Sequence, residues 1–322
     1  MVRLGGVAVF VATLCAIGSA FLWFDFSTVV GGVPSAEIAM VWLLIIGGAG
    51  FFLIGFADDL FDLSAVHRLW LQGLIAAVLW IFGLRIDTLF LPGLVPCSLG
   101  WWSLPITVLW IAGVVNAINW IDGLDGLAAG VSAIATAVIT SLAISTAQPM
   151  VALIASALLG SLLGFLVYNY NPAEIFMGDG GSYFLGFMLA SLCIVGPQQV
   201  DMPMASLLPL LILAVPIGDM TSVIVARLYQ RRSPFSADNL HIHHRLLNRE
   251  LNYKTVVWVM YLLTFASGSL ALTFAGVAGY FTLWTGSAVL MGFFIWQLVA
   301  QLKNRQVPQS KDSNVVVEKA IW

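Results

Sequence analysis

Four polar side chains recur at every third residue between two hydrophobic runs of the chain: Asn116, Asn119, Asp122 and Asp125. Three residues turn an α-helix by about 300°, so the first and last of these side chains would face opposite ways in a straight helix. Gly123 and Gly126 are expected to break the helix and let the carboxylates turn back toward the amides. Such groups could simply hydrogen-bond neighbouring helices. Because polar groups at a membrane boundary are costly, they are also candidates for a functional site.

Carboxylates lie at two other places where a hydrophobic run begins or ends. Asp58 and Asp59 close one run, and Asp179 lies between two glycines before another, in the segment that Asn171 opens. Adjacent carboxylates repel each other unless a cation or hydrogen-bond donors lie nearby. Glycines beside a carboxylate let a backbone approach a ligand closely. The simpler alternatives are an acidic helix cap for the pair and a plain turn for the Asp179 segment.

Basic and imidazole side chains form the fourth group. His241, His243, His244 and Arg245 lie close together, and Arg68 follows the acidic pair. A His-x-His pair could bind zinc, but no Cys lies near it and zinc sites usually have about three or four protein ligands. Imidazoles beside arginines suit phosphate and sugar hydroxyl groups better. Arg68 would either bind a phosphate through its guanidinium or act as a membrane anchor, with its guanidinium reaching the membrane surface.

Together, these groups predict metal-assisted phosphoryl transfer. Carboxylates alone would repel an anionic substrate, and a basic segment alone would need no carboxylates. Both occur where acids and amides hold Mg²⁺, or Mn²⁺ in its place, while the ion neutralises phosphate oxygens and Arg or His binds the remainder. We therefore expect a soluble phosphate donor and a membrane-embedded acceptor.

The composition places these groups in a membrane protein. Of the 322 residues, 60% are hydrophobic and 9% are charged, and the mean hydropathy is +0.98. Soluble domains carry roughly 25% charged residues, so that class is excluded. Apolar runs of about 17 to 25 residues predict an all-α, polytopic membrane protein with about ten helices. We expect one catalytic domain, 1–300, and a polar cytoplasmic tail, 301–322, with the three cysteines as packing residues.

The expected spans are Gly5 to Phe24, Ile38 to Phe56, Leu69 to Leu84, Leu104 to Asn116, Leu127 to Thr146, Val151 to Tyr168, Tyr183 to Val195, Met204 to Ile217, Val256 to Ala275 and Gly279 to Leu298. The fourth and seventh are short, which indicates shifted ends or a tilted or broken helix. With a cytoplasmic N-terminus, this path puts all 13 Lys and Arg except Arg85 on the cytoplasmic side, as the positive-inside rule requires. Every polar group above, and Asp219, then faces the cytoplasm.

In their order, and over nearly the whole chain, these motifs resemble those of the polyprenyl-phosphate N-acetylhexosamine-1-phosphate transferases, of the glycosyl transferase family 4 type. The matching segments are Gly55 to Leu63 (an acidic pair), Asn116 to Leu127 (an Asn/Asp motif), Asn171 to Ser182 (a Gly-Asp motif) and His241 to His244 (a histidine loop). The resemblance implies a multi-pass enzyme of the bacterial inner membrane with a cytoplasmic active site. It would transfer N-acetylhexosamine 1-phosphate from a UDP-sugar to undecaprenyl phosphate, release UMP and begin a surface glycan.

The resemblance also assigns roles. It implies Asn119 and Asp179 as Mg²⁺ ligands, and it places Asp58, Asp59 and Asp122 with Asp179 in catalysis. The implied substrate contacts are Arg68, Asn116, Asp125, Asn171, His241, His243, His244 and Arg245. Because a phosphate monoester has its second pKa near 6, we expect direct attack by the lipid phosphate and not a covalent aspartyl intermediate. Relatives carry a further helix and a basic loop before the position where this chain opens.

Two other functions stay open. Transfer of a peptide-bearing muramoyl phosphate is disfavoured by the histidine loop. The translocase branch of the family that this chain resembles has three consecutive histidines there, whereas this chain has His-Ile-His-His. An ion-coupled transporter is disfavoured because transporters bind near the bilayer midplane, between internal repeats. We expect lipid contacts and no nucleic-acid partner, and the oligomeric state is open, a homodimer included.

Overall fold

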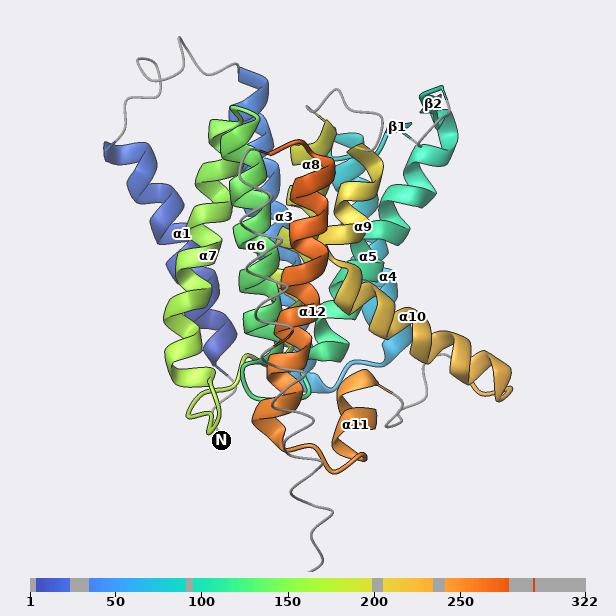
Figure 1. The fold of residues 1–322 in the computed structure, drawn as a ribbon. Helices are drawn as coiled ribbons and strands as arrows, with labels where there is room; N and C mark the ends of the chain where they lie inside the picture. Colours follow the sequence, from blue (N-terminus) through green and yellow to red (C-terminus); the bar gives the residue numbers. More distant parts are fainter. Residues whose placement is uncertain are drawn as a thin grey trace, which may run out of the picture.

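The structure is a computed structural model that describes residues 4–23, 35–90, 95–198, 205–233, 241–277 and 292. Long helices stand side by side in one bundle (Figure 1). The helices are α1 (Gly5–Trp23), α3 (Ser35–Phe61), α4 (Ala65–Ile81), α5 (Ser103–Ile121), α6 (Leu127–Ser145), α7 (Pro149–Asn169), α8 (Gly178–Gln198), α9 (Leu208–Ile212), α10 (Ala214–Tyr229), α11 (Ile242–Leu247) and α12 (Tyr253–Phe274). Short 3-10 turns precede α5 (Gly100–Trp102) and α9 (Ala205–Leu207).

Strands are confined to one small hairpin in the described residues. β1 (Thr88–Leu89) pairs antiparallel with β2 (Cys97–Ser98), with Thr88 opposite Ser98. The hairpin lies at one end of the bundle and α11 lies at the other (Figure 1).

The prediction of an all-α, polytopic membrane protein is confirmed. Seven of the described helices are long and apolar enough to cross a membrane, and α9 with α10 would make an eighth if the bent pair is one span. The fourth helix expected from the sequence extends beyond Asn116 to Ile121, and the seventh begins five residues earlier than expected, at Gly178. The expected span Gly279 to Leu298 lies outside the described residues, apart from one position, so the total of ten stays a prediction.

The expected span from Met204 to Ile217 is wrong as a single helix. The chain turns by 75° between α9 and α10, and α10 continues to Tyr229. Pro216 has no N–H to bond the carbonyl of Ile212, so the helix loses a backbone hydrogen bond at this point. The prediction failed because the residues on both sides of the break are apolar, so hydropathy does not mark the bend.

Helix α8 is the centre of the bundle. In its membrane-spanning window, 83% of the residues are buried. Gly55 of α3 lies so close to α8 that a Cβ there would overlap the carbonyl group of Asp179, and a Cβ on Gly6 of α1 would overlap the backbone of Gly181. These glycines let the two helices pack directly against the first turn of α8. That turn carries the carboxylate of Asp179.

Candidate functional site

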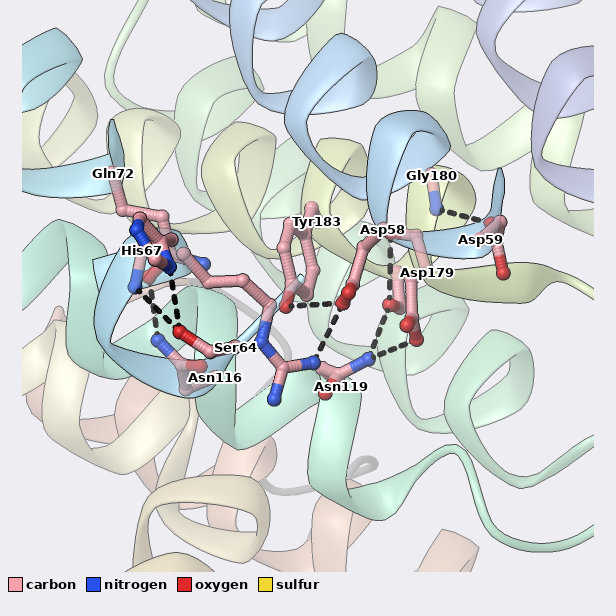
Figure 2. Close-up of polar contacts among 12 residues, drawn as sticks. Asp58, Asp59, Ser64, His67, Gln72, Asn116, Asn119, Asp179, Gly180 and Tyr183 are labelled. Atoms are coloured by element: carbon pink, nitrogen blue, oxygen red, sulfur yellow. Dashed lines mark hydrogen bonds and ion pairs between the residues drawn. The ribbon is translucent and has the colours of Figure 1, made fainter. Parts of the chain in front are cut away.

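The predicted acidic side chains meet at the α11 end of the bundle. Asp58 and Asp59 lie in the last turn of α3, Asn119 lies in the last turn of α5, and Asp179 lies in the first turn of α8. Each side chain is therefore carried by a rigid helix end instead of a loop. Figure 2 shows Asp58, Asp59, Asn119 and Asp179 grouped together.

Asn119 joins α5 to α8. Its Nδ2 donates to Oδ1 of Asp179 at 2.7 Å and to Oγ of Ser182 at 3.0 Å. Both amide hydrogens are thereby directed at α8, which fixes the orientation of the amide. Its Oδ1 is left as a neutral oxygen beside the carboxylate.

The two adjacent acids of α3 have different partners. Asp58 is 4% exposed; its Oδ2 pairs with Nη1 of Arg68 at 2.6 Å and accepts a hydrogen bond from the hydroxyl of Tyr183 at 3.4 Å. Oδ2 of Asp59 accepts from the backbone N–H of Gly180 at 3.0 Å. The expected repulsion between the carboxylates is thus offset by a guanidinium on one and a backbone dipole on the other.

The turn after α5 is tied to two other segments. Oδ2 of Asp125 accepts from Nδ2 of Asn171 at 3.0 Å and from the backbone N–H of Ala173 at 3.1 Å. The backbone N–H of Gly126, which has φ +75°, donates to Oδ1 of Asn169 at 3.0 Å. Asp125 and Asn171, predicted as separate substrate contacts, therefore bond each other and join two loops.

Two tyrosines of α12 form hydrogen bonds with the same turn. The Tyr253 hydroxyl accepts from the backbone N–H of Asp125 at 2.6 Å, and the Tyr261 hydroxyl donates to the carbonyl of Gly126 at 2.5 Å. Sequence reasoning missed both tyrosines and Asn169. The eight-residue spacing of the tyrosines, about two helical turns, indicates a shared face but not what that face contacts.

Some of these groups, namely Asp59, Asp125, Asn169 and Asp179, line a cavity of about 310 Å³. Its lining includes the four carboxylates of Asp59, Asp122, Asp125 and Asp179, and none of the described lining residues is Lys, Arg or His. Burial, with the nearby charges of Asp179, Asp59 and Asp125, raises the pKa of Asp122 to about 7. An anionic substrate could enter this cavity only together with cations.

The histidine segment lies against the edge of this cavity. A Cβ on Gly123, which lines the cavity, would lie 2.8 Å from Nε2 of His243. The ring of His243 stacks on that of His241 at 5.5 Å and lies 4.4 Å from that of His244. Burial, with the charge of His244, lowers the pKa of His243 to about 4, so its imidazole is neutral at neutral pH.

Other predicted residues lie farther out. Asn116 donates to Oε1 of Gln72 at 2.7 Å and to the carbonyl of Ala112 at 2.7 Å, and it is not part of the cavity lining. Arg245 is exposed on α11. A substrate contact by either residue stays a prediction.

The donor set fits Mg²⁺ better than a transition metal. The cavity offers carboxylate and amide oxygens, which Mg²⁺ prefers, and no sulfur or imidazole ligand among the described lining residues. Within the described parts of the chain, no three His, Cys, Asp or Glu side chains converge as a ready ligand set. Mg²⁺ commonly takes only one or two protein carboxylates and completes its shell with water and substrate phosphates. Asn119 and Asp179 would be the protein ligands under this arrangement.

Comparison with known proteins identifies the family of this chain. The family model described as glycosyl transferase family 4 matches residues 41–197. The chain is 33% identical over 304 residues, 94% of its length and 80% of the relative's, to a probable undecaprenyl-phosphate N-acetylglucosaminyl 1-phosphate transferase of Bacillus subtilis (strain 168). It is 34% identical to a decaprenyl-phosphate N-acetylglucosaminephosphotransferase of Mycobacterium leprae (strain TN), over 81% of this chain and 70% of the relative.

A third relative carries a different name. The chain is 30% identical to a phospho-N-acetylmuramoyl-pentapeptide-transferase of Halalkalibacterium halodurans, over 87% of this chain and 83% of the relative. All these similarities extend over most of both chains, and the matched model covers the acidic pair, the Asn/Asp turn and Asp179. The protein therefore belongs to glycosyl transferase family 4.

Proposed function

We propose that this protein transfers N-acetylhexosamine 1-phosphate from a UDP-N-acetylhexosamine to undecaprenyl or a related polyprenyl phosphate and releases UMP. The observation that carries the proposal is the acidic cavity at the ends of membrane helices, with the histidine segment against its edge. Arg68 pairs with Asp58, the neighbour of the cavity-lining Asp59. The names of the Bacillus and Mycobacterium relatives support this acceptor and sugar phosphate. A cavity at one end of the bundle also argues against a midplane transport site.

Mg²⁺, when bound by Asp179 and Oδ1 of Asn119, would neutralise the diphosphate and stabilise the charge that develops on it. The protein supplies the position of those oxygens. The hydrogen bond from Asn119 to Asp179 holds the Asn119 amide against a carboxylate that lines the cavity. Asp59 and Asp122 add negative potential for the cation without making a closed ligand set.

The reaction needs no general base. The acceptor phosphate has its second pKa near 6, so it is mostly dianionic at neutral pH. Its oxygen would attack the β-phosphorus of the donor, a new P–O bond would form, and the bond to the bridging oxygen would break with UMP as the leaving group. Asp58 is paired with Arg68 and Tyr183, which favours it as the group that positions Arg68 and not as a covalent nucleophile.

In the proposed orientation, the protein spans the bacterial inner membrane and its acidic cavity opens to the cytoplasm. Reporter fusions after Asp62, Leu127, Ser182 and Leu247 should report the cytoplasm, and one after Ser98 should report the opposite side. This follows from the distribution of Lys and Arg in the sequence. If fusions after Ser182 and Leu247 reported opposite sides, the acids and histidines could not share a site.

The proposed activity is tested with purified protein, polyprenyl phosphate and single UDP-sugars, followed by mass spectrometry of the lipid product. A diphosphate-linked N-acetylhexosamine lipid that forms with Mg²⁺ and not after exhaustive chelation is the expected result. A UDP-muramoyl-pentapeptide arm tests the activity named for the Halalkalibacterium relative. Product only in that arm, or full activity without divalent metal, would overturn the proposal.

A further inference from the structure

Asp219 is a buried acid outside the cavity. It lies on α10, just beyond the bend from α9, and is 1% exposed. It does not line the acidic cavity. Burying a carboxylate this deeply costs free energy unless hydrogen-bond or charged partners offset the loss of its hydration.

Both oxygens of Asp219 bind the histidine segment. Oδ2 lies 2.7 Å from Nδ1 of His241, and Oδ1 accepts from the backbone N–H of Ile242 at 2.6 Å. Since an ionised carboxylate only accepts hydrogen bonds, Nδ1 of His241 must carry the hydrogen. This two-point contact fixes the ring's orientation and tautomer and connects α11 to α10.

A residue in the last turn of α5 also contacts His241. The ring of Trp120, next to Asn119 in the chain, meets the imidazole edge-on at 5.7 Å. The guanidinium of Arg227, about two turns beyond Asp219 on α10, lies over the Trp120 ring at 4.9 Å. His241 is therefore held between α10 and the helix that carries the proposed ligand Asn119.

The position of His241 controls that of its neighbour. His243 is 1% exposed, stacks on His241 and lies against Gly123 at the edge of the cavity. Among the described residues, Nδ1 of His243 has no hydrogen-bond partner. A shift of His241 would therefore be passed to His243 and to the wall of the cavity.

We infer that Asp219 is a positioning residue, which holds His241 in the Nδ1–H tautomer and thereby keeps the histidine segment at the cavity where the UDP-sugar binds. The inference rests on the proposed function for its substrate, but the clamp itself does not. Asp219 acts through His241 and touches neither donor nor acceptor.

Asp219→Asn separates this role from a merely structural one. The amide keeps the size of the carboxylate, and its Oδ1 can still accept from the N–H of Ile242. Its Nδ2 is a donor, so Nδ1 of His241 would have to become an acceptor and the ring hydrogen would move to Nε2. Asp87→Asn is the matched control, because Asp87 is an acid paired with Arg85 beside the β1–β2 hairpin, away from the cavity.

The direct readout is the tautomer of His241. The chain has four histidines, so ¹⁵N-histidine labelling of purified protein gives few signals, and His241→Ala identifies the one that belongs to His241. We expect Nδ1–H in the unmodified protein and Nε2–H in Asp219→Asn. An Nε2–H signal in the unmodified protein would overturn the inference, whether or not the protein transfers sugar phosphate.

Kinetics supply the second readout. Asp219→Asn should raise the KM for the UDP-sugar roughly tenfold to a hundredfold, the scale of one hydrogen bond to a charged group, with a smaller change in kcat. In a His241→Ala background, the same substitution should have little further effect, because Asp219 would have nothing left to position. Asp87→Asn should leave KM unchanged. Equal effects of Asp219→Asn with and without His241 would mean that Asp219 acts elsewhere, and the inference would fail.

Discussion

Two cavities of similar size lie at opposite ends of the bundle and differ in chemistry. The acidic cavity of about 310 Å³ is lined by four carboxylates and is fixed by hydrogen bonds between α3, α5, α8 and α12. The other, of about 370 Å³, lies beside β1 and is lined mainly by apolar side chains such as Trp110, Ile194 and Pro209. The first depends on the identity of individual polar atoms, whereas the second depends on shape alone. Small changes of side chain should therefore impair turnover at the acidic cavity but leave it unchanged at the apolar one.

The largest effect is expected at the proposed metal ligands. Asp179→Asn and Asn119→Ala should each lower kcat by at least about 10²-fold, the scale of removing one electrostatic stabiliser of a transition state. Because the lost interaction strengthens in the transition state, KM should change less. Steady-state kinetics over a range of Mg²⁺ concentrations, with thermal unfolding as a folding control, measure this. Near-normal turnover of folded Asp179→Asn at low Mg²⁺ would move the ligand assignment to Asp58 and Asp59.

The next effect is expected at Arg68. Arg68→Ala removes a guanidinium that would bind the donor and that also pairs with Asp58, so KM for the UDP-sugar should rise roughly tenfold or more. Arg68→Lys keeps the charge but loses the planar fork, so it should restore only part of the affinity. A loss confined to kcat in both variants would assign Arg68 to the transition state instead. His243→Ala should resemble Arg68→Ala in raising KM.

A smaller effect is expected on the stability of the metal-free protein. The pKa of Asp122 is raised to about 7 in the folded state, so its ionisation favours unfolding as pH rises above its ordinary value near 4. Asp122→Asn should therefore raise Tm in the presence of a chelator at pH 8, and the gain should shrink toward pH 5. Thermal unfolding of both proteins across this range tests the sign. A stabilisation that grew at low pH would contradict the assigned cause.

The smallest effect is expected in the apolar cavity. Ile194→Val removes one methylene from a side chain that is 3% exposed, which should cost about 1 kcal/mol of stability. The kcat and KM of the enzyme should not change. If this variant impaired turnover as strongly as Asp179→Asn, the contrast between the cavities would be wrong.

The sequence predicted which polar side chains gather at the cavity better than it predicted the contacts that hold them in place. Hydropathy predicted most helices, and the polar motifs at their ends predicted which side chains gather, because the ends of successive membrane helices return to the same side. Asn119 and Asp179 are the strongest case, since their 2.7 Å hydrogen bond joins two motifs that are 60 residues apart.

The supporting contacts were beyond sequence reasoning for physical reasons. Tyr253 and Tyr261 are ordinary aromatic residues of a membrane helix, and only tertiary packing brings their hydroxyls to the turn at Gly126. The pairing of Arg68 with Asp58 depends on the angle between α3 and α4, which periodicity does not give. The bend before α10 had a local signal in Pro216, but the continuous hydropathy concealed it.

The most direct test of the proposed function follows the β-phosphorus of the donor. Purified protein is incubated with UDP-N-acetylglucosamine labelled at the β-phosphate, polyprenyl phosphate and Mg²⁺, and the lipid and aqueous products are separated. The predicted result is label in a diphosphate-linked lipid and unlabelled UMP in the aqueous phase, with Asp179→Asn at background level. Labelled UDP in the aqueous phase, with an unlabelled glycolipid, would show that the enzyme transfers the sugar alone and would contradict the account.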